Sequence, residues 1–135
     1  FIIDFEGEPR RTLTERRMKA PAARDVAGLI RSIDYSVSAA LDRSLKVKAD
    51  DSGQLQTALA QWRDESTHTF LTSYRAAMTD GRLWPSDPAA ADNLLRFFLL
   101  EKAFYEIEYE LAHRPDWLRV ALSGALRVLR EGGPA

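Results

Sequence analysis

The sequence has no cysteine, only two histidines, no long apolar run and no excess of charge of one sign. Without cysteine there are no disulfides, thiolate metal sites or cysteine nucleophiles. The 19 Lys and Arg against 20 Asp and Glu argue against nucleic acid as a partner, because nucleic-acid-binding domains carry a clustered basic excess. The longest apolar run, Phe97–Leu100, is far shorter than the ~20 residues of a membrane helix. We therefore expect no membrane partner and a cytoplasmic location.

Complete catalytic motifs are also missing. The seven glycines form neither of the common phosphate-binding loops, and no serine lies in a nucleophile elbow. His68 and His113 are far apart in sequence, and no carboxylate pair frames either at metal-ligand spacing. We therefore assign no catalytic residue within these 135 residues.

Helical periodicity is the strongest signal that is present. Apolar residues recur at steps of three and four over residues 22–45, 55–78, about 88–113, and from Trp117 to the Gly132-Gly133 pair. The many charges and the final proline of residues 10–21 predict a loop that contains at most one helical turn. The sequence predicts an all-α body of about four long helices. We assign five aromatic side chains to the core of this body: Trp62, Phe70, Phe97, Phe98 and Phe104.

The N-terminus differs from the rest, because Phe1–Ile3 is a short β-prone run. A carboxylate at the end of such a strand suits Mg²⁺, which takes one or two protein oxygens and completes its shell with water and phosphate. Asp4 supplies one carboxylate, and Glu6 points to the same side if the chain stays extended. The alternative is a solvated acidic turn.

Several stretches in the same order resemble the bacterial maltokinases: DFEGEP (4–9), ERR (15–17), RDVAGLIRS (24–32), EKAFYEIEYEL (101–111) and RPDW (114–117). These enzymes belong with the aminoglycoside-phosphotransferase-like kinases, and some are fused to a trehalose synthase. The matched stretches cover about half of the chain. The resemblance implies that residues 1–135 form the helical C-terminal part of a kinase-like large lobe, with the N-terminal lobe and the catalytic loop lying before it.

The resemblance also assigns roles. Asp4 would hold the Mg²⁺ that bridges the phosphates of ATP, as the aspartate of the kinase DFG motif does. Asp25 would brace the catalytic loop through hydrogen bonds to its backbone and would not touch substrate. The alternative for Asp25 is an ordinary acid in the first turn of a helix, which the helix dipole favours.

A sugar site is expected on the second matched stretch. Tyr105 and Tyr109 are one helical turn apart, and Glu106 and Glu110 form a second ladder on the neighbouring face. Aromatic faces beside carboxylates suit a disaccharide, which stacks its C–H faces and hydrogen-bonds its hydroxyls. Arg114 and Trp117 follow the helix end, and we count both with Tyr105, Tyr109 and Glu106 as substrate-binding residues. The alternative is that the tyrosines are core aromatics.

The implied function is that of the C-terminal part of an ATP- and Mg²⁺-dependent kinase that converts maltose to maltose 1-phosphate in trehalose and glycogen metabolism. Its partners would be maltose, ATP and the missing N-terminal kinase segment. The chain alone should be inactive, since phosphoryl transfer depends on positioning both substrates and neutralising charge. The alternative is a non-catalytic helical interaction domain, free or appended to a trehalose synthase.

Overall fold

The computed structural model describes residues 8–47, 52–78 and 83–131. All regular structure in these ranges is helical, which confirms the all-α expectation. The predicted strand at residues 1–3 lies outside them. The elements are α1 (Leu13–Arg17), α2 (Ala23–Val47), α3 (Ser52–Ala77), α4 (Pro88–His113), the single 3₁₀ turn η1 (Pro115–Trp117) and α5 (Leu118–Glu131). Of the helices described, none has both the length and the apolar character needed to cross a membrane.

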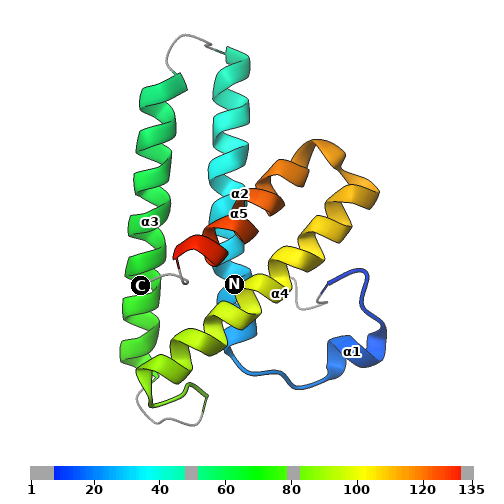
Figure 1. Cartoon of the computed structure of the whole chain (residues 1–135), viewed down its shortest axis with the longest axis vertical. Helices are drawn as coiled ribbons and strands as arrows, with labels where there is room; N and C mark the ends of the chain where they lie inside the picture. The colour runs from blue at the N-terminus through cyan, green and yellow to red at the C-terminus, as the bar shows by residue number, and fades with distance from the viewer. Residues whose placement is uncertain (1–7, 48–51, 79–82, 132–135) are drawn as a thin grey trace.

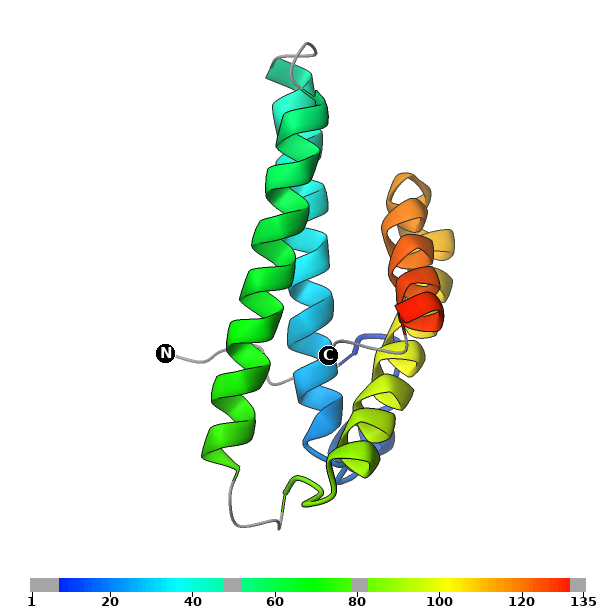
Figure 2. The same ribbon diagram turned by 60° about the vertical axis from the view of Figure 1, so that its left-hand side comes forward.

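Two helical hairpins form the body. Helices α2 and α3 run side by side in both ribbon views, and α4 and the shorter α5 make a second hairpin that crosses them (Figures 1 and 2). Helix α2 is central, because it packs against α3, α4 and α5. Residues 8–22, which we call the N-terminal strap, carry α1 and lie beside α4 (Figure 1).

Local sequence explains where two of the helices begin. Asp87 accepts a hydrogen bond from the Ala90 amide at 2.8 Å, and Pro88 occupies the first turn of α4, where its missing N–H costs nothing. In α1 a capping box joins Thr12 and Glu15, since each side chain bonds the backbone of the other. Hydrogen bonds from Thr12 also hold the pKa of Glu15 below its usual value.

The core lies where α2 meets α3 and the first half of α4. Its buried members are alanines and branched aliphatic residues from the three helices, together with Trp84 from the segment before α4. They include Ala23, Val26, Ala27, Ile30, Leu71, Trp84, Ala91, Leu95 and Leu99. Burying each of the leucines contributes about 1.5–3 kcal/mol.

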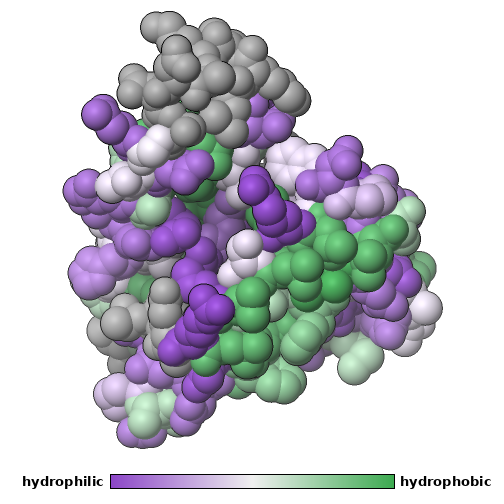
Figure 3. Space-filling view, turned by 45° about the horizontal axis from the view of Figure 1, so that its top comes forward, coloured by the Kyte–Doolittle hydropathy of each residue, from purple (hydrophilic) through white to green (hydrophobic). Residues whose placement is uncertain are grey.

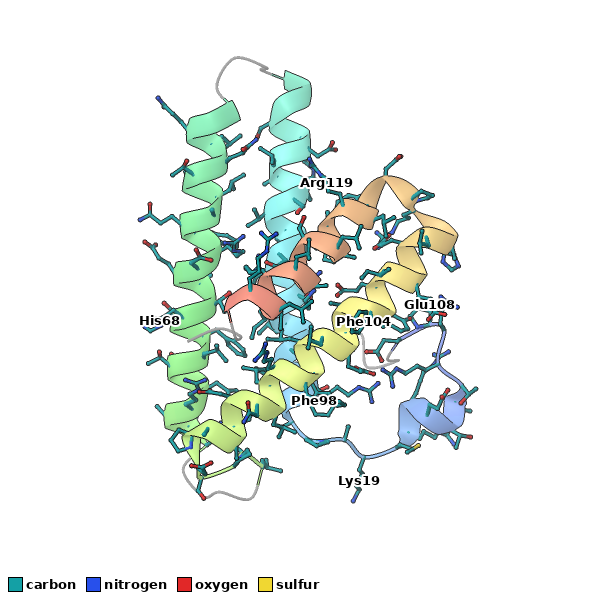
Figure 4. The ribbon with its side chains drawn as sticks, viewed as in Figure 1. Lys19, His68, Phe98, Phe104, Glu108 and Arg119 are labelled. Atoms are coloured by element: carbon teal, nitrogen blue, oxygen red, sulfur yellow. The ribbon has the colours of Figure 1, made fainter. Side chains whose placement is uncertain are left out.

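The predicted core assignment of the aromatic residues is only partly right. Phe70 and Phe98 pack against the core, but Trp62, Phe97 and Phe104 are each at least half exposed. Figure 4 labels Phe104 on α4. The periodicity identified the helices correctly, but it did not identify which apolar face of α4 points inward.

Candidate functional site

A groove of about 970 Å³ lies between the strap, α2 and α4. Its walls are rich in charged and aromatic side chains. It is lined by Glu8, Pro9, Arg16, Met18 and Ala20 of the strap, by Arg24, Asp25, Gly28, Ser32 and Tyr35 of α2, by Lys102, Tyr105, Glu106, Tyr109 and Glu110 of α4, and by Arg114. The structure therefore brings together six of the residues that the sequence analysis named: Asp25, Tyr105, Glu106, Tyr109, Glu110 and Arg114.

The predicted tyrosine ladder forms one wall. The rings of Tyr105 and Tyr109 stack with their centroids 6.3 Å apart, and His113 continues the stack 4.5 Å from Tyr109. The Arg114 guanidinium lies over Tyr109 at 5.4 Å, and the Lys102 ammonium lies 5.2 Å from the Tyr105 ring. These tyrosines are half-buried, so part of each ring faces the groove.

Glu106 and Glu110, which lie on the same helix as these rings, are buried at the groove floor. Glu110 is 1 % exposed and accepts hydrogen bonds from the Tyr35 hydroxyl at 2.9 Å and from Arg114 Nε and Nη2 at 2.9 and 2.7 Å. Glu106 accepts from Arg31 Nε at 2.8 Å. Burial raises the pKa of Glu106, although Arg31 and then Lys102 oppose this effect.

Tyr35 is a groove residue that the sequence did not reveal. Its ring stacks on Trp117 with centroids 5.9 Å apart and planes 5° from parallel. Burial and then the charges of Glu106 and Glu110 raise the pKa of its hydroxyl. Trp117 therefore supports the site by stacking behind Tyr35, and it also lies 5.6 Å from the Arg114 guanidinium.

Asp25 lies in the first turn of α2 with an exposed side chain that lines the groove. This placement fits the first-turn acid that we offered as the alternative. Its predicted role as a brace of the catalytic loop stays a prediction. Asp4 and Glu6, the predicted Mg²⁺ ligands, lie outside the described residues. In the ranges that the structure describes, no three His, Asp or Glu side chains come close enough to hold a metal ion.

Ion pairs fasten the strap to the open side of the groove. Glu8 lies 3.2 Å from both Lys102 Nζ of α4 and Arg24 Nη2 of α2. Arg11 pairs with Glu101, and Arg10 pairs with Glu108, which is labelled on α4 in Figure 4. Partial burial of Glu8 opposes ionisation, yet Lys102 and then Arg24 hold its pKa below the ordinary value of 4.5.

A lowered folded-state pKa means that the Glu8 contacts stabilise the strap above pH 4.5 and are lost as the pH falls through the folded pKa. We expect Glu8→Gln, which imitates protonation, to speed amide hydrogen exchange of residues 8–17 at pH 7. Mass spectrometry of the exchanged protein measures this. Glu65→Gln is the control, because Glu65 is an exposed carboxylate of α3 that bonds Gln61 of the same helix. Equal exchange in wild type and Glu8→Gln would contradict the prediction.

No protein-family model matches the chain. Over 119 residues it is 27% identical to a glucosamine kinase from Streptacidiphilus jiangxiensis, and the aligned part is 88% of this chain. The chain is similar to part of a sugar kinase. It spans about a quarter of the length of that relative, at 25%. The similarity therefore supports a kinase-like relationship without distinguishing between sugars.

Proposed function

We propose that this chain is the C-terminal helical part of an ATP- and Mg²⁺-dependent sugar kinase, and that its groove binds maltose for conversion to maltose 1-phosphate. The carrying observation is the groove between α2 and α4, where stacked tyrosines stand beside buried, hydrogen-bonded glutamates. The similarity to a glucosamine kinase and the resemblance of the DFEGEP and EKAFYEIEYEL stretches to maltokinases support the same reading.

The groove suits a sugar for two reasons. The half-buried rings of Tyr105 and Tyr109, stacked 6.3 Å apart, give the groove wall apolar surface for the C–H groups of a sugar. Carboxylates and guanidinium groups at the floor offer fixed acceptors and donors for hydroxyl groups. Because Tyr35 and Arg114 both donate hydrogen bonds to Glu110, the positions of these three side chains are set before a ligand arrives.

Charge pairing favours a neutral sugar over a cationic amino sugar. Glu106 is paired with Arg31, Glu110 with Arg114, and Glu8 with Arg24 and Lys102. A buried ammonium needs a carboxylate partner, and these three are already neutralised. The fourth groove carboxylate, Asp25, is exposed and therefore offers no buried partner. This argument supports maltose rather than glucosamine as the acceptor.

The residues of this chain would bind and orient the acceptor. Mg²⁺, bound through Asp4 with Glu6 as a second ligand, would neutralise charge on the phosphates of ATP. The nucleotide lobe and the catalytic base are expected in the N-terminal kinase segment. The 135-residue chain alone should therefore show no phosphorylation of maltose, and detectable activity would contradict this division of roles.

The full-length protein tests the proposal in assays of ATP-dependent phosphorylation of maltose, glucose and glucosamine. We expect maltose to have the highest kcat/KM. Tyr109→Ala should raise the KM for maltose about ten-fold, or about 1.4 kcal/mol, because it removes an aromatic side chain from the groove wall. Phe104→Ala is the matched control, since Phe104 is an exposed aromatic of the same helix and does not line the groove. Preference for glucosamine would refute maltose as the acceptor, and no phosphorylation of any sugar would refute the kinase.

One observation favours the alternative, an interaction domain. Six large apolar side chains are exposed on α4 and α5: Phe97, Phe104, Leu111, Leu122, Leu126 and Leu129. A broad hydrophobic band crosses the face shown in Figure 3. Exposed apolar surface of this kind marks interaction sites. A full-length protein that binds a trehalose synthase and lacks sugar phosphorylation would support this second function.

A further inference from the structure

Arg31 is the largest of the fully buried polar side chains, at 1 % exposed, and it lies where α2, α4 and α5 meet. Its Nε donates to Glu106 Oε2 at 2.8 Å, and its Nη2 lies 2.6 Å from the same oxygen. Its Nη1 donates to Asp34 Oδ2 at 2.6 Å. Arg127 of α5 also binds Asp34, so a chain of alternating charges joins α5 to the groove floor.

The place of the guanidinium depends on Gly124 of α5. A Cβ atom at position 124 would lie 1.6 Å from Arg31 Nη1 and 2.4 Å from Arg31 Cζ. No side chain fits there while Arg31 holds its present position. Gly124 therefore provides the space that lets the guanidinium reach Glu106.

We propose that Arg31 is a positioning residue for sugar binding, which aims the Glu106 carboxylate at the groove, and that Gly124 is required for this role. The proposal rests on the proposed function, because Glu106 is taken to accept hydrogen bonds from the sugar. Arg31 itself does not line the groove; it acts through Glu106, which does.

Stability alone is a poor explanation for this ion pair. Burying an Arg–Glu pair costs desolvation energy that roughly offsets its attraction, and apolar residues of similar volume often serve a core equally well. The helices around Arg31 already pack through small apolar residues such as Ala27, Ala103 and Ala121, all fully buried. A buried carboxylate that must accept hydrogen bonds from a ligand, by contrast, needs a cationic partner that keeps it charged and in place, as Arg31 does for Glu106.

Several groups set the charge of Glu106. On α2 these are Arg31 and Asp34, and on α4 it is Lys102. Tyr35 lies close enough for the charge of Glu106 to raise the pKa of its hydroxyl, and Arg127 of α5 pairs with Asp34. Burial and Asp34 raise the pKa of Glu106, whereas Arg31 and Lys102 lower it. Without Arg31, burial and Asp34 would raise the pKa of Glu106 further, so Glu106 should become protonated at a higher pH.

The first experiment measures maltose affinity of the full-length protein by calorimetry between pH 5.5 and 8.5. Arg31→Met should weaken binding at least ten-fold at pH 6, and the loss should shrink as the pH rises. Arg31→Lys should recover part of the affinity, and Glu106→Gln should bind weakly with little pH dependence. A loss in Arg31→Met that is equal at every pH would mean a merely structural role and would overturn the proposal.

The second experiment tests Gly124 and remains informative if Arg31→Met folds poorly. Gly124→Ala should reproduce the weakened, pH-dependent binding of Arg31→Met, and the double variant should be no worse than Arg31→Met alone. Gly53→Ala on α3 is the control, because a Cβ there meets nothing within 4 Å, and it should bind like wild type. Unchanged affinity in Gly124→Ala, or additive losses in the double variant, would refute the role of Gly124.

A third measurement separates this inference from the proposed function. Carbon-13 NMR of the protein labelled at glutamate carboxyl carbons follows the titration of Glu106 without sugar, and Glu106→Gln identifies its signal. The Glu106 titration should move to higher pH in Arg31→Met. If wild type binds no maltose, the proposed function fails, and this titration still decides the Arg31–Glu106 link. An unmoved titration would overturn the link even in a protein that phosphorylates maltose.

Discussion

Replacing Leu99 with alanine is expected to lower the free energy of unfolding by about 2–5 kcal/mol, because it leaves a cavity that the surrounding side chains cannot fill. Leu99 is 1 % exposed and lies on α4 within the core cluster formed with α2 and α3. Urea denaturation of the 135-residue chain, followed by circular dichroism at 222 nm, measures the change. A large loss would also show that α4 packs as described.

Leu111→Ala is the matched control for Leu99→Ala. It removes the same atoms from the same helix, but Leu111 is 58 % exposed, so the free energy of unfolding should change by less than about 0.5 kcal/mol. Similar losses in the two variants would mean that Leu111 is also buried, which would contradict the described packing of α4.

The positions of the long helices could be predicted because local signals set them. Steps of three and four between apolar residues identified α2 to α5. The cap and proline at the start of α4, Asp87 and Pro88, likewise depend on neighbouring residues alone. The inward face of α4 could not be predicted. Phe97, Phe104 and Leu111 recur every seven residues and form an apolar stripe as regular as the buried one, so hydrophobicity alone does not separate them.

The candidate site was predictable where it depended on one helix and not where it depended on two. Tyr105 and Tyr109 are neighbours on any α-helix, so their stacking follows from spacing. The buried face of α4 continues from Leu99 and Ala103 into Glu106 and Glu110. Buried carboxylates require cationic or hydrogen-bonding partners. On α2, Arg31 binds Glu106 and Tyr35 binds Glu110, and the two members of each pair are 75 residues apart in the sequence.

Arg31 and Tyr35 were missed for the same reason. Both lie on α2, where the apolar residues Val26 and Ile30 define the helix pattern and charged residues read as solvent-facing. Arg31 and Tyr35 are one helical turn apart with Asp34 between them. This cluster indicates a polar network only when the packing of α4 against α2 is known. Polar residues within an otherwise buried helix face are then the mark of a functional or positioning network.

The second large effect is expected for Glu110→Gln in the full-length protein, where the KM for maltose should rise about 10- to 100-fold. Loss of a hydrogen bond to a charged group costs about 1.5–3 kcal/mol, and this range sets the expected factor. Glu110 joins the Tyr35 hydroxyl to both Arg114 nitrogens. The neutral amide cannot accept from both donors with charge assistance, so Tyr35 and Arg114 lose their fixed positions at the groove floor.

Glu108→Gln provides the comparison that makes the Glu110 result interpretable. Glu108 lies two residues earlier on α4, carries the same charge and is exposed, with one ion pair to Arg10 of the strap. Glu108→Gln should leave the KM for maltose unchanged. The kcat should change little in either variant, because the reacting phosphate is expected to bind to the nucleotide lobe. An unchanged KM in Glu110→Gln, or an equal rise in Glu108→Gln, would mean that the sugar does not bind at this groove floor. An effect confined to Glu110 would connect the buried carboxylate, through Tyr35 and Arg114, to recognition of the acceptor.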